Sequence, residues 1–173
     1  KSDFGLTGDE SLLVYVGRLS SEKNLPALLE QFAAARAFVS DLRLALFGKG
    51  PQEAELRQLA GELGIGDVVD FRGVVPYDEV ADWLAAADGF ITASTSEVHP
   101  LTVIEAMAAG KPILAIQSPG ISDTVENGVT GLLAATVDGL DAAIVGLFAG
   151  RGRARAMGTA ARLLDALDDY GSL

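Results

Sequence analysis

Two glutamates stand at a spacing that would let both act on one ligand. Glu97 and Glu105 are separated by seven residues, and Pro100 lies between them. Proline is tolerated in the first turn of a helix and glycine often ends one, so we expect a helix that starts at Pro100 and stops at Gly110. Glu97 then precedes the helix while Glu105 lies on it. The two carboxylates can therefore face one crevice from different depths.

The surroundings expected for Glu105 make it unusual. Residues 101–109 are apolar on nearly every face except at Thr102 and Glu105, which is the pattern of a helix packed inside a domain. A carboxylate in such surroundings needs a partner, because an isolated buried charge costs several kcal/mol or more. The structural alternative to a ligand is an ion pair between Glu105 and Arg18 or Lys111.

Two cations follow the first apolar run of the chain. Arg18 presents a planar fork of donors and Lys23 a compact point charge, which together suit a diphosphate. Gly17 lets the backbone come close to a ligand. The N–H groups near Leu101 and Thr102, at the start of the expected helix, would bind the same phosphates from the other side. The alternative is that both cations are solvated loop charges.

These residues carry a resemblance to a known family. Glu97, Glu105 and the following Ala-Met-Ala-Ala-Gly-Lys-Pro resemble the Glu-x7-Glu signature of retaining glycosyltransferases of family 4, which have the two-domain GT-B architecture. A second motif, Gly-Arg-Leu-Ser-Ser-Glu-Lys-Asn at 17–24, stands at the expected place. The resemblance extends from Val14 to about Arg162.

The resemblance implies roles for individual residues. In that family the first glutamate binds the hexose, the second binds the ribose, and the arginine and lysine bind the diphosphate. The backbone after the third strand, here around Val75, holds the base. His99 replaces the aromatic residue more usual in the family, and a packed imidazole or a helix cap is the alternative to donor contact. The binding residues expected on this basis are Gly17, Arg18, Lys23, Val75, Glu97, His99, Pro100, Leu101, Thr102 and Glu105.

The activity implied is transfer of a hexose from a UDP- or GDP-sugar to a glycan, lipid or small-molecule acceptor, with the anomeric configuration retained. Glu97, Arg18 and Lys23 are the expected catalytic residues. The cations and the helix start would carry the charge of the leaving diphosphate, so we expect no metal and no cofactor. The enzyme is expected to act in cell-envelope polysaccharide synthesis. We also expect the full-length enzyme to associate peripherally with the membrane.

Composition limits the other classes. A chain of 173 residues fits one domain, 1–173, with a sizeable core. The 13 basic residues against 24 acidic ones give a net charge of −11, which argues against nucleic acid as a partner. The absence of cysteine and the single histidine disfavour disulfides and zinc. Without a long apolar span or a leader pattern, the expected location is cytoplasmic.

The elements that would position these residues alternate between short apolar runs and amphipathic stretches. This pattern predicts an α/β fold, a three-layer αβα Rossmann-like domain with a mostly parallel six-stranded sheet, the C-terminal half of a GT-B fold. Asn24 is the expected N-cap of the first helix. Strands are expected at 12–17, 42–47, 68–71, 89–92, 112–116 and 131–133, and helices at 24–39, 52–63, 77–87, 101–109, 140–148 and 153–167, with a short turn of helix around Asp123.

The strand order gives the two motifs a common location. In the order 3-2-1-4-5-6, the first and fourth strands are neighbours and a crevice opens where their connections diverge. The segments 17–24 and 94–100 would then form opposite walls of one cleft. Gly48-Lys49-Gly50 is a weak match to a phosphate loop, and Trp83 is expected in the core.

Two other functions remain open at this point. An NAD-dependent Rossmann domain is disfavoured because the first strand ends without G-x-G-x-x-G. A non-catalytic nucleotide-binding or interaction module is harder to exclude, since a GT-B enzyme needs an N-terminal acceptor domain, which we expect to be absent from this chain. We therefore expect the chain alone to bind nucleotide weakly and to transfer nothing.

Overall fold

The computed structural model describes residues 5–96, 100–150 and 152–171. A central sheet of six strands has the order β3-β2-β1-β4-β5-β6, as predicted. Every strand pair is parallel. The strands are β1 (Ser11–Val16), β2 (Leu42–Phe47), β3 (Val69–Gly73), β4 (Gly89–Ile91), β5 (Ile113–Ile116) and β6 (Gly131–Ala134). The α/β Rossmann-like fold class is thereby confirmed.

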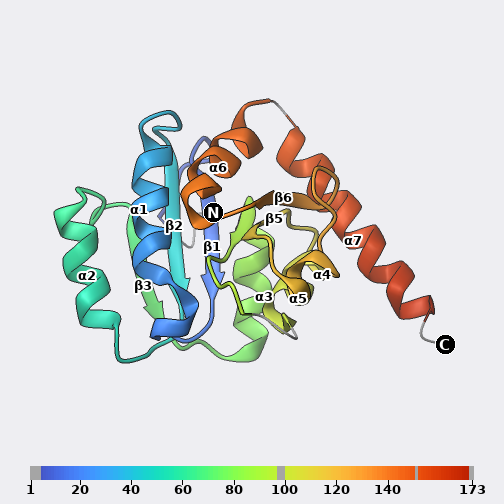
Figure 1. Cartoon of the computed structure of the whole chain (residues 1–173), viewed down its shortest axis with the longest axis horizontal. Helices are drawn as coiled ribbons and strands as arrows, with labels where there is room; N and C mark the ends of the chain where they lie inside the picture. Colours follow the sequence, from blue (N-terminus) through green and yellow to red (C-terminus); the bar gives the residue numbers. More distant parts are fainter. Residues whose placement is uncertain (1–4, 97–99, 151, 172–173) are drawn as a thin grey trace.

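Helices cover both faces of the sheet (Figure 1). One face packs against α1, α2 and α6, and the other against α3, α4, α5 and the middle of α7. Their bounds are α1 (Leu25–Arg36), α2 (Glu53–Glu62), α3 (Tyr77–Ala86), α4 (Leu101–Ala108), α5 (Pro119–Ser122), α6 (Leu140–Phe148) and α7 (Arg153–Gly171). Two short 3-10 helices, η2 (Ser21–Lys23) and η3 (Val137–Gly139), were not predicted.

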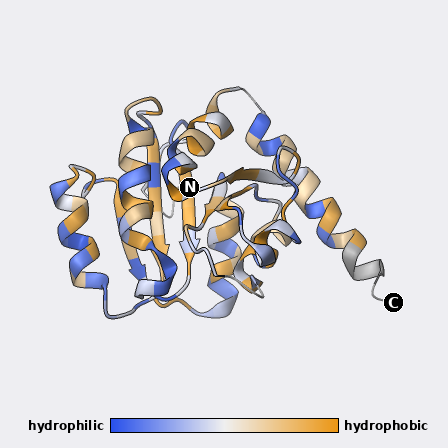
Figure 2. Ribbon diagram, viewed as in Figure 1, coloured by the Kyte–Doolittle hydropathy of each residue, from blue (hydrophilic) through white to orange (hydrophobic). Residues whose placement is uncertain are grey.

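The strands are apolar on both faces because both faces are covered. In β1, Leu13 and Tyr15 belong to the core beneath α1 and α6, while Leu12 and Val14 belong to the core beneath α3 and α4. Successive side chains of a strand point to opposite faces, so a strand buried on both sides reads as a continuous apolar run. Figure 2 shows the hydrophobic strands at the centre and the hydrophilic residues on the outer helices.

The loops after β1 and β2 are joined by backbone hydrogen bonds beyond the strand ends. Leu19 N donates to Lys49 O at 3.1 Å and Gln52 N donates to Leu19 O at 3.0 Å. A Cβ on Gly48 would lie 1.8 Å from Gly17 O, and φ at Gly48 is +132°. Only glycine allows this approach. The two loops therefore form one rigid edge.

This packing predicts a large cost for a methyl group at position 48. Gly48→Ala should lower the free energy of unfolding by roughly 2 kcal/mol or more, because the new Cβ meets backbone in a strained conformation. Gly61→Ala is the matched control, since a Cβ there meets nothing within 4 Å and lies inside α2. It should be neutral or stabilising. Chemical denaturation of both variants checks this, and equal stabilities would contradict it.

Asn24 occupies the N-cap position of α1, as predicted, but its side chain does not cap the helix. Its backbone is left-handed, with φ 55°, and its side chain makes no capping hydrogen bond. Its Nδ2 instead donates to Ala93 O, just beyond β4, at 3.2 Å. Asparagine tolerates the left-handed region, which leaves its amide available for this longer contact. Asn24 thus ties the segment after β1 to the segment after β4.

Candidate functional site

Two adjoining cavities open at the carboxyl ends of the strands. Both are lined by Val16, Gly17 and Arg18, at the end of β1. The smaller, of about 300 Å³, lies between β1 and β4, where the strand order reverses direction. Ligands of doubly wound sheets bind at this switch point. A cavity therefore lies where the strand order predicted a crevice.

The smaller cavity brings the predicted wall 17–24 together with the start of α4, whereas no described residue of the other predicted wall, 94–100, lines it. Arg18 and Lys23 line it from the segment after β1, and Leu101 and Thr102 line it from the first turn of α4. The start of a helix exposes N–H groups and carries a partial positive charge. Two basic residues and a helix start thus lie around one space that can hold an anion.

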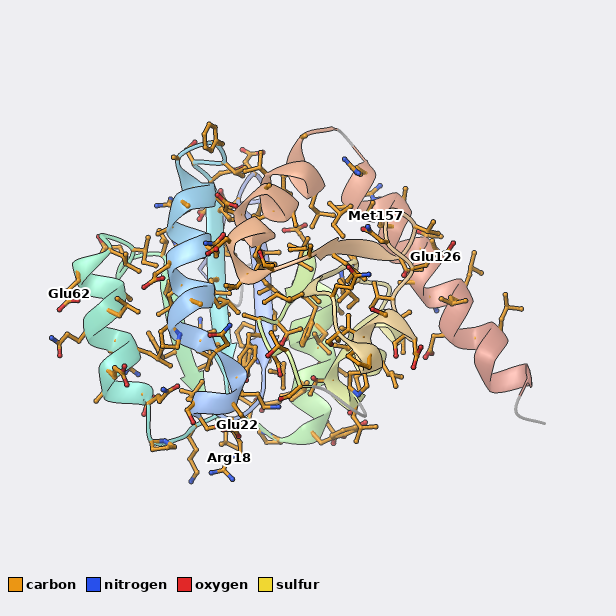
Figure 3. The ribbon with its side chains drawn as sticks, viewed as in Figure 1. Arg18, Glu22, Glu62, Glu126 and Met157 are labelled. Atoms are coloured by element: carbon orange, nitrogen blue, oxygen red, sulfur yellow. The ribbon has the colours of Figure 1, made fainter. Side chains whose placement is uncertain are left out.

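Arg18 is held through its backbone while its side chain stays available. The buried Tyr15 hydroxyl donates to Arg18 O at 2.8 Å. A Cβ on Gly17 would lie 2.6 Å from that hydroxyl oxygen, so glycine is needed there for this contact. The Arg18 side chain is exposed and extends from the edge of the sheet, beside Glu22 (Figure 3). Among the described residues, no acid forms an ion pair with it.

An acidic residue also lines this cavity. Ser20 Oγ donates to Glu22 Oε1 at 2.7 Å. This hydrogen bond lowers the pKa of Glu22 below its ordinary value, with smaller contributions from its own backbone and from the charges of Arg18 and Lys23. Glu22 is ionised at neutral pH, as an ordinary glutamate is, and its lowered pKa keeps it ionised at more acidic pH. Its carboxylate therefore opposes a bound anion.

Removing that charge should strengthen anion binding. Glu22→Gln is expected to tighten the binding of a nucleoside diphosphate roughly threefold, since exposed charge pairs have small effects. Calorimetry at low and high salt checks this, because screening should reduce the gain. Since protonation also removes the charge, the advantage of the variant should shrink as pH falls through the lowered pKa. Weaker binding by Glu22→Gln would show that the carboxylate helps the ligand.

The larger cavity, of about 770 Å³, is formed by the ends of β1, β2 and β3. Val75, around which the sequence predicted base binding, lines this cavity together with the exposed Val74. The segment Gly48–Gly50 lines it too, although the sequence marked this segment only as a weak phosphate loop. The sequence signal that could have identified this segment is the Gly-x-Gly-Pro turn directly after a buried strand.

Glu105 lies outside both cavities. It lines a third hollow of about 360 Å³ between α3 and α4, which meets the larger cavity at Val80. The prediction of a fully enclosed helix is wrong, since Leu101 is 67% exposed, Ile104 is 38% exposed and Glu105 is half-buried. α4 packs on the sheet through one side only, with Val103, Ala106 and Met107 buried.

The alternative ion pairs of Glu105 are not formed among the described residues. Lys111 Nζ donates instead to Ala85 O, at 2.8 Å. The carboxylate is therefore available at the hollow beside the larger cavity. Its role toward a ribose stays a prediction.

Two predicted site residues, Glu97 and His99, lie outside the described residues. Pro100, which follows them, is buried and directly precedes α4.

Trp83 is half-buried. The centroid of its ring lies 5.4 Å from the centroid of the Phe47 ring and 4.9 Å from the Arg72 guanidinium carbon. Trp83 packs against the core as predicted. None of the described helices is long and apolar enough to cross a membrane.

The structure defines a Rossmann-like αβα domain with two adjoining cavities at the carboxyl ends of its parallel strands. The model of the family described as "Glycosyl transferases group 1" matches residues 1–164. The chain belongs to this family. Its fold is that of the C-terminal domain of a GT-B glycosyltransferase.

Individual proteins show the same relationship. Alpha-monoglucosyldiacylglycerol synthase of Streptococcus pneumoniae is 35% identical over 77% of this chain and 30% of its own length. The GDP-mannose-dependent alpha-(1-6)-phosphatidylinositol monomannoside mannosyltransferase of Mycolicibacterium smegmatis is 33% identical over 92% of this chain and 44% of its own length. The sucrose-phosphate synthase structure from Thermosynechococcus elongatus aligns with a TM-score of 0.85 and 31% identity, over 96% of this chain and 43% of that one. The chain thus spans less than half of these relatives.

Proposed function

We propose that this chain is the donor-binding domain of a retaining glycosyltransferase that transfers a hexose from a UDP- or GDP-sugar to a glycan, lipid or small-molecule acceptor. The observation that carries the proposal is the convergence of Arg18, Lys23 and the start of α4 on one cavity at the switch point. A diphosphate matches these groups in charge and in the number of acceptors it offers.

The same groups account for the chemistry proposed. Cleavage of the bond between the anomeric carbon and the diphosphate oxygen leaves negative charge on the diphosphate. Arg18, Lys23 and the N–H groups at the start of α4 would stabilise that charge as it develops. The reaction proposed needs no metal, because these groups carry the neutralising charge. Glu97 would accept hydrogen bonds from hexose hydroxyls, and Glu105 would accept hydrogen bonds from the ribose hydroxyls.

The names of the relatives support sugar transfer to lipids as one acceptor class. Two of the three relatives described above are named for products or substrates that contain a lipid. We place the full-length enzyme in the cytoplasm, acting on cell-envelope acceptors and associating peripherally with the membrane. Since the chain spans less than half of those relatives, the acceptor site is assigned to a separate N-terminal domain.

Binding measurements on this chain test the donor site. Calorimetry with UDP, GDP, ADP and NAD should show weak binding of a nucleoside diphosphate, and Arg18→Ala should abolish it. Preference for NAD, or no binding of any nucleotide, would overturn the proposal. A transfer assay on the full-length protein separates an enzyme from a non-catalytic binding module. The anomeric configuration of its product, read by NMR, tests retention.

A further inference from the structure

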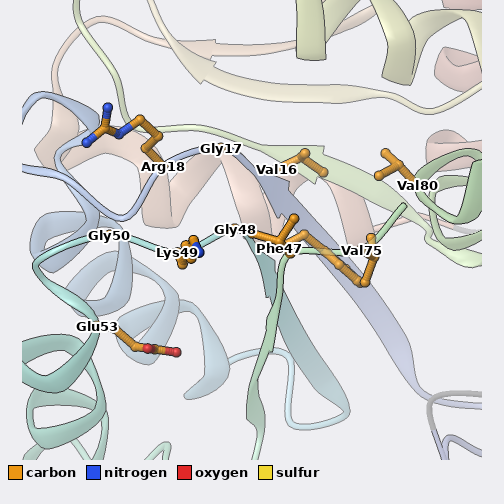
Figure 4. A pocket seen from close by; sticks show the side chains of 11 residues that line it. Val16, Gly17, Arg18, Phe47, Gly48, Lys49, Gly50, Glu53, Val75 and Val80 are labelled. Carbon is orange, nitrogen blue, oxygen red and sulfur yellow. The ribbon is translucent and has the colours of Figure 1, made fainter. Parts of the chain in front are cut away.

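The larger cavity combines apolar walls with a carboxylate and two cations, of which Arg18 is shared with the smaller cavity. Val16, Phe47 and Val80 supply apolar side chains from β1, β2 and α3, while Lys49 and Glu53 supply opposite charges from the segment between β2 and α2 and from the start of α2. In Figure 4, Val75 and Val80 lie across the cavity from Glu53 and Arg18. A planar aromatic ring with polar edges fits such a space, because apolar walls contact its faces and charged groups meet its edges.

Both charged side chains are carried by well-held backbone. Lys49 stands between two glycines that pack against the loop after β1, and its carbonyl accepts from Leu19 N. Glu53 is the first residue of α2, and its Oε1 lies 3.4 Å from Arg57 Nη2. The Arg57 guanidinium in turn lies 4.5 Å from the Phe71 ring centroid. The Arg57 contact leaves the other carboxylate oxygen of Glu53 free among the described residues.

The nucleobases differ in what they offer to a carboxylate and an ammonium group. Guanine presents two adjacent donors, N1–H and N2–H, to a carboxylate, and two adjacent acceptors, O6 and N7, to a lysine. Adenine offers a carboxylate only its N6–H donors. Uracil offers one donor, N3–H, between two carbonyl oxygens that a carboxylate repels. Of these three bases, only guanine presents donors on two neighbouring atoms to the carboxylate and two neighbouring acceptors to the lysine.

We propose that the larger cavity selects guanine, with the Glu53 carboxylate accepting from N1–H and N2–H and the Lys49 ammonium donating to O6 and N7. This assignment rests on the proposed function and adds the identity of the base. The donor would accordingly be a GDP-sugar. Glu53 and Lys49 act here as specificity-determining residues and take no part in bond cleavage.

Inosine diphosphate provides a sharp probe because it lacks only the N2 amino group of GDP. In calorimetry on this chain, GDP should bind roughly tenfold tighter than IDP and tighter still than UDP or ADP, since a bidentate contact discriminates by about 1–3 kcal/mol. In Glu53→Gln the GDP-to-IDP ratio should fall close to one. Lys49→Met should weaken GDP and IDP equally, because O6 and N7 are common to both.

Glu55→Gln is the matched control, since Glu55 is an exposed acid in the same helical turn that does not line the cavity. It should leave the ratio unchanged. UDP binding as tightly as GDP, or an unchanged GDP-to-IDP ratio in Glu53→Gln, would overturn the assignment. If all nucleoside diphosphates bind and Arg18→Ala weakens each of them, but UDP binds most tightly, only the base assignment fails. If none binds, the proposed function itself fails.

Discussion

Lys23→Ala in the full-length glycosyltransferase is expected to lower kcat roughly a hundredfold, the usual effect of removing one group that stabilises developing charge. Lys23 lines the smaller cavity with Arg18 and the start of α4, where the leaving diphosphate would lie. The loss should be larger in kcat than in KM, because the charge on the diphosphate grows in the transition state. Steady-state kinetics with the donor varied measures both.

The control for Lys23→Ala is Arg155→Ala, which removes an equal charge. Arg155 is exposed on α7 and lines neither of the two adjoining cavities. It should leave kcat within roughly twofold of the parent enzyme, since distant surface charges are largely screened. Unchanged kinetics in Lys23→Ala would refute the role assigned to this residue, and equal losses in both variants would point to net charge.

Glu97→Ala is expected to lower turnover roughly tenfold or more, because the proposed hydrogen bonds to the hexose hydroxyls orient the reacting sugar. Inhibition by the free nucleoside diphosphate should not change, since Glu97 is assigned to the sugar. Glu126→Ala removes an exposed acid that lines none of the three hollows described above and serves as the control. Equal weakening of the sugar-nucleotide and the free nucleotide would place Glu97 elsewhere.

The sequence was sufficient to predict the architecture because each element carries a local signal. The continuous apolar runs at 42–47 and 113–116 are typical of strands covered on both sides, and both are observed as strands. The alternation of strands and helices then favours the doubly wound order, which places segments 17–24 and 101–102 at the same edge. Their convergence on one cavity follows from that order.

Contacts between segments distant in the sequence were decided only by the tertiary structure. Asn24 carries a signal for a helix cap, yet its amide reaches Ala93, because its backbone adopts a left-handed turn that no local pattern specified. The exposure of Leu101 likewise depends on which side of α4 the sheet covers.

The same distinction explains why the sequence predicted only Val75 and the shared Gly17 and Arg18 among the residues that line the larger cavity. Gly48 and Gly50 are ordinary turn residues in the sequence, and their need for close packing appears only when the carbonyls of Gly17 and Leu19 are placed beside them. The sequence by itself determined the order of the elements and the cations at the switch point. The fold alone decided that Lys49 and Glu53 line the same cavity as Val75, because side chains on separate loops meet only after the strands have paired.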